Sequence, residues 1–283
     1  MKHLYTFFFI IIATVSHGSD IDLKQRGALV DLYNATNGAQ WTKQWNLSDA
    51  VDKWYGVTVE NGNITRIDLA NNNLSGFIPE SIGQIKSLKS INFFRNNLSG
   101  KIPTEIGNLP HLEFLNLAFN QLSGEIPATI CRLSSLQILE LHMNRLSGTI
   151  PNYVGKMQNL QVLSLYNNAL AGSIPMSLYQ LKSLKTLLLN SNLIEGTISP
   201  QIANLSQLQS LSLFENNMEG HIPAGLATLN LLEMNISYNK FSGSIPQKLA
   251  RLDSFHMTML NQNGLAVALQ VAAESNTAVA SED

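Results

Sequence analysis

Residues 112–135 read LEFLNLAFNQLSGEIPATICRLSS, and this pattern occurs eight times between residues 64 and 252. The repeats start at Ile64, Leu88, Leu112, Leu136, Leu160, Leu184, Leu208 and Leu231. Successive starts are 24 residues apart until the last interval, which is 23. One such unit cannot bury its own apolar side chains, but stacked units can. The period therefore predicts a solenoid in which each repeat forms one coil.

Each position inside the unit has a physical role. Leu115 and Leu117 alternate, so they point to the same face of a short strand. Asn120 follows that strand, and its amide can bond backbone groups that the turn would otherwise bury unpaired, from coil to coil. Gly124 permits a backbone conformation that a β-carbon would penalise. Pro127 keeps the residue before it extended.

The motif L-S-G-x-I-P in a 24-residue unit resembles the plant-type leucine-rich repeat over residues 64–252. That family includes plant receptor-kinase ectodomains, polygalacturonase-inhibiting proteins, and secreted bacterial and protist proteins. The resemblance implies an α/β repeat solenoid, a curved right-handed superhelix with a parallel concave sheet and a helical N-terminal cap. Residues 52–59, DKWYGVTV, resemble the cap motif C-x-W-x-G-V-x-C without its two cysteines. This form looks most like the disulfide-free caps of the secreted bacterial and protist members.

The chain divides into four predicted segments. Residues 1–18 resemble a signal peptide, because Lys2 and His3 precede the apolar run 4–15 and Ser16-x-Gly18 offers small residues for cleavage. Residues 19–63 form the N-terminal cap, residues 64–252 the eight repeats, and residues 253–283 a C-terminal cap and polar tail. We expect a mature chain without a membrane span that is secreted, on the cell surface, or periplasmic.

The N-terminal cap is expected to begin with a helix from Ser19 or Asp20 to about Ala35, stopped by Asn37-Gly38. Three tryptophans follow, at positions 41, 45 and 54. They can cover the first coil, or they can form an aromatic platform for carbohydrate. We favour covering, because the ends of a solenoid need caps for solubility.

Four local features of the sequence lead to further structural predictions. The sixth repeat has Ser199 where proline is expected, and the seventh is one residue short before Leu231, so both should distort the convex side. Cys131 is interpreted as a small, semi-buried apolar residue. Residues 254–263 should be irregular, and residues 264–273 are apolar enough to cover the last coil.

No catalytic constellation stands out in the sequence. Charged residues make up 13% of the chain, the formal net charge is −2, and no basic run suggests a nucleic-acid partner. The histidines are scattered, and phosphate-loop, dinucleotide and nucleophile-elbow motifs are absent. Asp68 and Glu140 share a sheet face but lie three coils apart, roughly 14 Å at ~4.8 Å per coil, too far for a glycosidase pair. We therefore expect no enzyme activity, cofactor or metal.

The residues between the strand leucines are free of core demands, so their identity is informative. Aromatic, methionine and arginine side chains are enriched in interface cores, and exposed apolar patches mark binding sites. A first group of candidates crosses repeats two to five: Phe94, Arg95, Phe119, His142, Met143 and Tyr166. A second, smaller group is Phe214, Glu215 and Tyr238, and Asn116 and Glu140 are added as polar residues that would orient a ligand.

These residues predict non-catalytic recognition of an extracellular protein or peptide through the concave face. Phe94, Phe119 and Tyr166 would be the anchors, with Arg95, Asn116, Glu140 and His142 setting orientation. His142 would also make binding depend on pH near 6 to 7. The alternatives are carbohydrate binding, inhibition of a secreted polysaccharide-degrading enzyme by family analogy, and a structural role.

Overall fold

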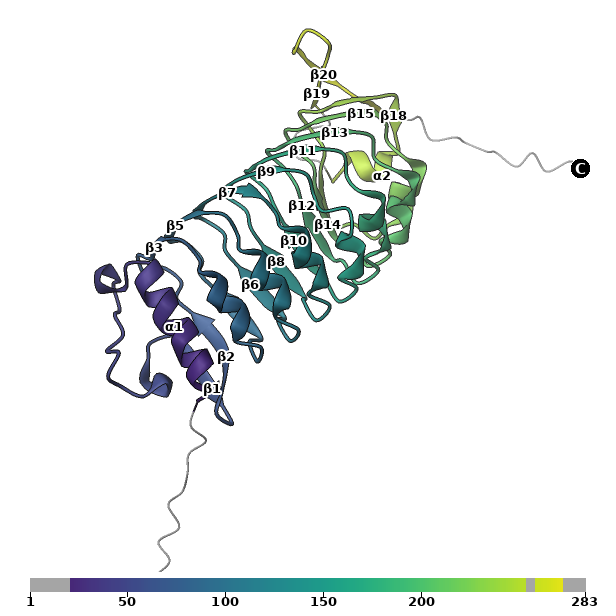
Figure 1. Cartoon of the computed structure of the whole chain (residues 1–283). Coiled ribbons are helices and arrows are strands. Elements are labelled where there is room, and N and C mark those ends of the chain that lie inside the picture. Colours follow the sequence, from purple (N-terminus) through teal and green to yellow (C-terminus); the bar gives the residue numbers. More distant parts are fainter. Residues whose placement is uncertain (1–20, 253–257, 272–283) are drawn as a thin grey trace, which may run out of the picture.

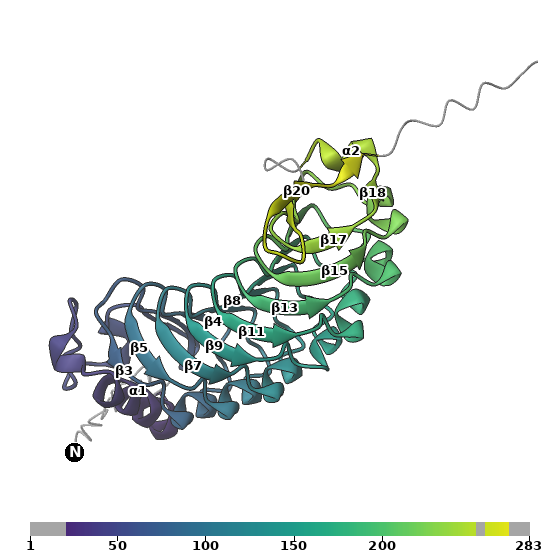
Figure 2. The same cartoon turned by 90° about the horizontal axis from the view of Figure 1, so that it is seen from above.

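The computed structural model describes residues 21–252 and 258–271, which form a curved, elongated stack of coils (Figure 1). Viewed from above, the stack is an arc with short helices along its outer side (Figure 2). The predicted signal segment, residues 1–18, lies outside the described residues. The polar tail beyond residue 271 lies outside them too.

A nine-stranded sheet lines the concave side of the described chain. From β2 onward its neighbours are parallel and in register, so that Leu115 lies beside Ile91 and Leu139 in the next coils. The predicted parallel concave sheet is thus confirmed. In sheet order the strands are β1 (Val57–Glu60), β2 (Asn63–Asp68), β4 (Ser90–Asn92), β6 (Phe114–Asn116), β8 (Ile138–Glu140), β10 (Val162–Ser164), β12 (Thr186–Leu188), β14 (Ser210–Ser212) and β16 (Glu233–Asn235).

A second sheet of eight strands, which the repeat pattern did not predict, runs along the side of the described solenoid. Its strands come from the L-S-G segment of each repeat and pair in parallel, as Ser123 does with Arg145. Gly124 has φ +78°, which confirms its expected role. The strands are β3 (Ser75–Gly76), β5 (Asn97–Gly100), β7 (Gln121–Glu125), β9 (Arg145–Gly148), β11 (Ala169–Gly172), β13 (Leu193–Gly196), β15 (Asn217–His221) and β17 (Lys240–Ser242).

Short 3-10 helices form the convex side, most of them starting directly after the repeat proline, whose extended backbone precedes the turn. These helices are η3 (Glu80–Gln84), η4 (Thr104–Asn108), η5 (Ala128–Arg132), η6 (Val154–Lys156), η7 (Met176–Gln180), η8 (Pro200–Asn204) and η9 (Ala224–Thr228). The last coil has a short α-helix instead, α2 (Gln247–Ala250).

The two irregular repeats behave differently from each other. The distortion expected at Ser199 is wrong, because Ser199 (φ −66°, ψ 143°) adopts nearly the conformation of Pro175 (φ −68°, ψ 141°). Its side chain also accepts a hydrogen bond from the Gln201 N–H (3.2 Å) and so caps η8. The missing residue of the seventh repeat is absorbed at Leu229, which is extended at ψ 152°, whereas Leu205 has ψ 59° one coil earlier.

One continuous apolar core runs through the coils, and a ladder of asparagines borders it. The Asn120 amide donates to the carbonyls of Leu117 (3.0 Å) and Phe93 (2.9 Å). Its Oδ1 accepts from the Leu98 N–H (3.0 Å), and equivalent bonds recur in other coils. The predicted asparagine ladder is therefore confirmed. Cys131, expected to be semi-buried, is buried, and burial raises the pKa of its thiol to about 11.

The N-terminal cap begins with α1 (Leu23–Ala35). Its N-cap is Asp22, which accepts from the Lys24 N–H (3.1 Å), so the predicted start at Ser19 or Asp20 is two residues or more too early. Two 3-10 turns follow, η1 (Gly38–Gln40) and η2 (Val51–Lys53). Asn37 has φ +54° and lies where the helix was expected to stop.

The three tryptophans of the cap are buried, with 2 to 4% of each residue exposed. Trp45 packs between the other two, with ring centroids 4.8 Å from Trp41 and 4.7 Å from Trp54. Each indole N–H donates to a backbone carbonyl. For example, the Trp41 indole N–H donates to Thr36 O (2.9 Å). The covering role is confirmed. The carbohydrate platform is wrong, because no ring face is open to solvent.

The cap also contains an antiparallel hairpin, β1–β2, which starts the concave sheet. Asn61 (φ 51°) and Gly62 (φ 74°) form its turn, with Glu60 paired to Asn63. An Asn-Gly pair between alternating apolar residues is a strong hairpin signal, so this element was predictable from residues 57–64. The hairpin places the first repeat strand in register with the cap.

The C-terminal segment differs from its prediction. Thr258–Leu260 (β19) pairs with Ala266–Ala268 (β20), and Ser244–Ile245 (β18) pairs with Gln270–Val271 (β21), so residues 258–263 are not simply irregular. The hairpin projects from the last coil (Figure 1). The segment joins that coil by backbone bonds, such as Tyr238 N–H to Thr258 O (2.6 Å). The apolar cover expected over 264–273 is wrong for residues 264–271, because most of these side chains are exposed. Residues 272 and 273 lie outside the described residues.

Candidate functional site

The aromatic row is a line of four rings across neighbouring coils of the concave side: Phe94, Phe119, His142 and Tyr166. Ring centroids are 5.2 Å apart for Phe94–Phe119 and 5.5 Å apart for Phe119–His142, both edge to face. His142 and Tyr166 stack in parallel at 4.3 Å. The structure therefore joins four of the predicted residues into one contact chain.

Phe119 reaches this row from a different backbone position than the other three rings. Residues 94, 142 and 166 are equivalent in their repeats, and the third repeat has a fully buried Ala118 there. Phe119, one residue later, supplies the missing ring from a left-handed backbone conformation (φ 55°). A β-carbon makes this conformation unfavourable by about 1–2 kcal/mol. Hydrogen bonds to adjacent coils hold it in place, such as Phe119 N–H to His142 O (3.0 Å).

Several predicted residues share this left-handed position. They were predicted to lie in the strand, but they lie in the turn that follows it. Their φ values run from 53° to 57°: Arg95, Phe119, Met143, Glu215 and Tyr238. Among them Arg95 is exposed, and the Met143 sulfur contacts the Asn167 amide (2.6 Å). Side chains here border the concave sheet where each strand ends.

His142 is buried within the aromatic row. Its Nδ1 lies 3.0 Å from the Ser164 hydroxyl, and Phe119 and Tyr166 pack on either side of the ring. Burial lowers the pKa of the imidazole to about 4. The predicted binding switch near pH 6 to 7 is therefore wrong, because the ring is already neutral throughout that range.

The polar row is formed by Asn116, Glu140 and Ser164, which lie side by side on β6, β8 and β10. Asn116 was expected to contact a ligand, but it is buried. Its amide donates to Glu140 Oε2, and its Oδ1 accepts from the Ala118 N–H (2.9 Å). It therefore positions Glu140. Burial raises the pKa of the Glu140 carboxyl, and the pKa of Tyr166 is raised by burial and then by the charge of Glu140.

The apolar row, Phe114, Ile138 and Val162, was missed by the sequence prediction. These half-buried side chains are paired across the same three strands, two residues before the polar row. The signal was available, because this repeat position is apolar only in the third, fourth and fifth repeats. Elsewhere it holds Arg66, Ser90, Thr186, Ser210 and Glu233.

The second predicted group is separate from the first. Phe214 and Tyr238 contact each other with centroids 5.2 Å apart. Glu215 accepts a hydrogen bond from the Ser191 hydroxyl (2.8 Å). The sixth coil has Asn190 at the ring position, so the aromatic row does not continue across it.

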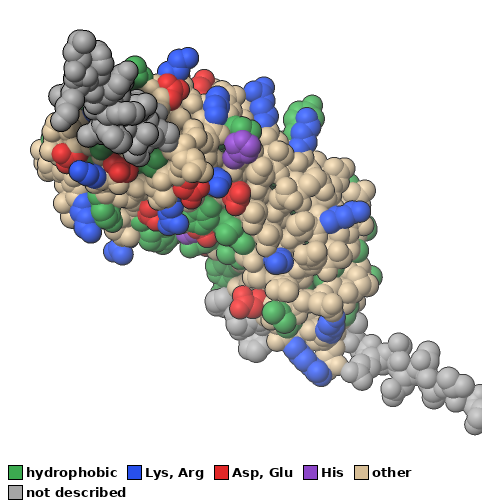
Figure 3. Space-filling model, turned by 90° about the horizontal axis from the view of Figure 1, so that it is seen from below, with side chains coloured by type: hydrophobic (Ala, Val, Ile, Leu, Met, Phe, Trp, Pro, Cys, Tyr) green, Lys and Arg blue, Asp and Glu red, His purple; other side chains and the backbone are tan. Residues whose placement is uncertain are grey.

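The site is an open, hollowed surface. In the space-filling view from below, hydrophobic side chains gather along the inner margin of the arc beside charged ones (Figure 3). One depression of the described chain, about 880 Å³, involves the second sheet at Glu195, Glu219 and Lys240. A smaller one, about 340 Å³, lies near the starts of the concave strands at Glu113 and Gln161. Neither contains a residue of the aromatic row.

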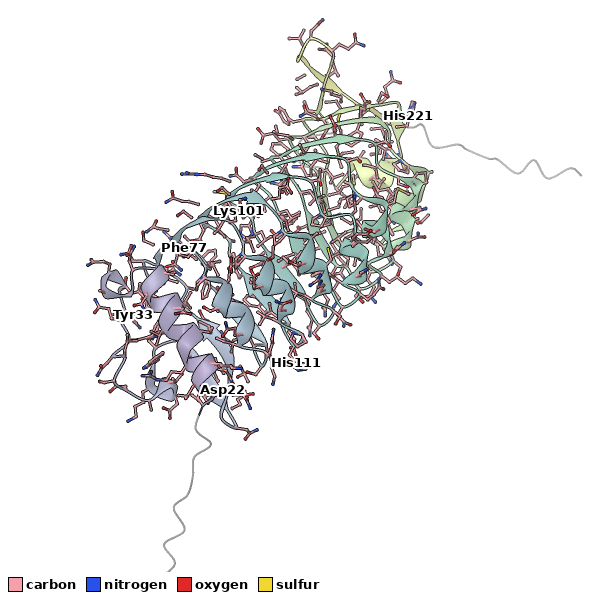
Figure 4. The ribbon with its side chains drawn as sticks, in the orientation of Figure 1. Asp22, Tyr33, Phe77, Lys101, His111 and His221 are labelled. Atoms are coloured by element: carbon pink, nitrogen blue, oxygen red, sulfur yellow. The ribbon has the colours of Figure 1, made fainter. Side chains whose placement is uncertain are left out.

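Groups for metal binding are not brought together in the described ranges. No cluster of three or more His, Cys, Asp or Glu residues there could hold an ion. His111 and His221 lie at opposite edges of the solenoid (Figure 4). Across residues 21–252 and 258–271, no helix has the length and apolar character needed to span a membrane.

Comparison with known proteins agrees with the fold. The family model described as "Leucine-rich repeat region" matches residues 67–260, more than half of the chain. The chain belongs to the leucine-rich repeat family. Its solenoid, long parallel sheet and helical N-terminal cap are those of plant-type leucine-rich repeat ectodomains.

Three matches illustrate this leucine-rich repeat relationship. The crystal structure of PEPR1-AtPEP1 matches with a TM-score of 0.72 and 31% identity, over 81% of this chain and 36% of that one. The plant peptide hormone receptor RGFR1 in complex with RGF2 matches with a TM-score of 0.64 and 35% identity, over 73% and 32%. MDIS1-interacting receptor like kinase 1 of Arabidopsis thaliana is 40% identical over 87 residues, 29% of this chain and 8% of that protein. The chain thus spans well under half of these relatives.

Proposed function

We propose that this leucine-rich repeat protein is a non-catalytic recognition protein that acts outside the cytoplasm. Its ligand is an extended peptide, or an extended segment of an extracellular protein, lying across the concave strands. The observation that carries the proposal is the unbroken aromatic row over four neighbouring coils, which lies outside the two depressions described above. Open aromatic surfaces of this kind suit polypeptide ligands, which bind through a few desolvated anchors.

The length of the row sets the size of the bound segment. Four coils at ~4.8 Å spacing span roughly 14 Å, and an extended chain rises ~3.3 Å per residue. A segment of about four or five residues therefore covers the row. Phe94, Phe119 and Tyr166 are its anchors, because His142 between them is already buried.

The relatives support this proposal. RGFR1 is a plant peptide hormone receptor, solved in complex with RGF2. The resemblance to extracellular receptor ectodomains supports a location outside the cytoplasm. The leucine-rich repeat ectodomain fold is consistent with a non-catalytic role.

Carbohydrate binding is less well supported by the geometry. Sugar rings stack on open aromatic faces, and here His142 and Tyr166 already stack on each other at 4.3 Å. The edge-to-face contacts of Phe119 occupy further ring surface. No observation in the described residues favours inhibition of a polysaccharide-degrading enzyme over peptide recognition.

The test is selection of random linear peptides displayed on phage against the secreted protein. Selected peptides should bind the triple variant Phe94→Ala/Phe119→Ala/Tyr166→Ala at least ~tenfold more weakly, because aromatic anchors dominate such interfaces. The matched control, Phe77→Ala/Tyr153→Ala/Met176→Ala, removes three large side chains that are 53 to 63% exposed outside the row. It should retain full affinity.

Equal binding by both variants would refute the concave site. Failure to select any peptide, together with binding of the unaltered protein to a glycan array, would support the carbohydrate alternative. Melting temperatures of all three proteins establish that each is folded.

A further inference from the structure

Glu140 occupies a distinctive place on the concave face. It lies on β8, the middle strand of the polar row, with Ile138 of the apolar row on the same strand and His142 of the aromatic row two residues beyond its end. Residues two apart on a strand share a face, so the carboxylate is bordered by apolar side chains on one side and rings on the other. It is half-buried, whereas its row neighbours Asn116 and Ser164 are buried.

Only one oxygen of the Glu140 carboxylate accepts a hydrogen bond from the described residues. Oε2 accepts a hydrogen bond from Asn116, while Oε1 makes none there. No lysine or arginine of the described chain forms an ion pair with it. The two ion pairs found join Arg66 to Asp68 (2.6 Å) and Lys89 to Glu60 (3.3 Å). A half-buried carboxylate without a cation loses solvation and gains little in return, which is consistent with its raised pKa.

Building on the proposed function, we infer that the bound peptide carries a basic side chain, arginine or lysine, that pairs with Glu140. The cation complements the one charge at the centre of the three rows. Partly desolvated surroundings strengthen that pairing relative to water. The ring of Tyr166, close enough to sense the charge of Glu140, offers a cation–π contact to the same group.

The apolar row and the aromatic row also determine which ligand residues fit beside this basic side chain. The apolar row and the aromatic row flank Glu140, so apolar ligand residues belong on either side of the cation. The ligand class is therefore a short extended segment with one basic residue among apolar ones. A peptide whose only charges are acidic would be excluded by repulsion.

The experiment uses random heptapeptides with acetylated and amidated ends, so that a cation can come only from a side chain. The unaltered protein should enrich peptides with arginine or lysine at one position between apolar residues. Replacing that residue by its neutral isostere, citrulline or acetyl-lysine, should weaken binding to the unaltered protein at least ~tenfold, and to Glu140→Gln less than about twofold.

Glu125→Gln is the matched control, because it removes the same charge from an exposed side chain at the end of β7 in the second sheet. Its affinity should fall by the same factor as that of the unaltered protein when the basic residue of the peptide is replaced by its isostere. Glu140→Gln should melt no lower than the unaltered protein, since burial already disfavours the ionised carboxyl. The isostere comparison on the unaltered protein does not depend on any variant folding.

The outcomes separate this inference from the function on which it rests. Enriched peptides without a basic residue, or an isostere effect of equal size in Glu140→Gln, would overturn the inference while peptide recognition stands. Absence of any enrichment relative to the Phe94→Ala/Phe119→Ala/Tyr166→Ala variant would overturn both.

Discussion

His142 is the single residue on which the continuity of the aromatic row depends. It contacts Phe119 edge to face and Tyr166 face to face, and it shares a hydrogen bond with Ser164. Burial lowers the pKa of its imidazole to about 4. Its protonation therefore changes the stability of the fold at acid pH and does not act as a binding switch near neutral pH. The unfolded chain binds this proton at about pH 6.5.

This difference predicts how stability depends on pH. The stabilisation by neutral His142 is fully present above about pH 6.5 and is lost as the pH falls toward the folded pKa of about 4. Between pH 7.5 and pH 5 the melting temperature of the unaltered protein should therefore fall more than that of His142→Gln. The difference should be about 4–8 °C, corresponding to about 2 kcal/mol. Differential scanning calorimetry at both pH values measures it.

The control for this prediction is His221→Gln, which removes an exposed histidine from the second sheet. Its melting temperature should fall with pH as that of the unaltered protein does. An identical fall in His142→Gln would show that the buried imidazole does not govern acid sensitivity.

At the scale of elements, the hairpin β1–β2 connects the cap to the repeats. β2 pairs with β1 on one side and with β4 on the other, so the turn at Asn61-Gly62 positions the first edge of the concave sheet. β1 also covers what would otherwise be an open edge of the parallel sheet. The turn needs positive φ at both residues.

Two glycine substitutions test the role of this turn. Gly62→Ala should lower the free energy of unfolding by about 1–2 kcal/mol, because alanine is strained at φ +74°. Gly27→Ala should raise it by about 0.5–1 kcal/mol, because Gly27 is in α1 and no atom lies within 4 Å of the added β-carbon. Urea denaturation measures both changes, and a stabilising Gly62→Ala would contradict the turn.

At the scale of the whole molecule, stability comes from one core shared by all coils. Leu117 is completely buried in this core, and its N–H donates to Glu140 O in the next coil (2.9 Å). Because each coil contacts mainly its neighbours, a defect in the middle separates the coils on its two sides.

Leu117→Asp should therefore abolish the cooperative unfolding transition, since it places an unpaired charge in this core. The control Thr104→Asp, at the exposed start of η4 in a neighbouring coil, should change stability by less than about 0.5 kcal/mol. Circular dichroism melting distinguishes the two. A normal transition in Leu117→Asp would mean that the repeat register is wrong.

Much of the architecture could be predicted because the repeat determines it locally. Leu117, Asn120 and Gly124 each have the burial, hydrogen bonds or backbone angle that their position in the unit required. The second sheet was missed because its strands have no apolar alternation of their own. They are held by pairing with neighbouring coils.

The positions of the candidate site residues in the fold were only partly predictable from the sequence. Phe94 and Tyr166 lie on the concave side as expected, whereas Asn116 was expected to contact ligand but is buried beside Glu140 on the neighbouring strand. The row of Phe114, Ile138 and Val162 escaped notice because apolar residues beside core leucines look like further core.

The sequence by itself determined the solenoid, the coil boundaries and the residues that build its core, because those follow from a period and from local backbone preferences. Only the tertiary structure decided that Phe119 replaces Ala118 in the aromatic row, that His142 stays neutral, and that Glu140 forms no ion pair within the described part of the chain. These properties depend on contacts between residues about one repeat apart and on exclusion of water. Neither is encoded in the repeat pattern of a single coil.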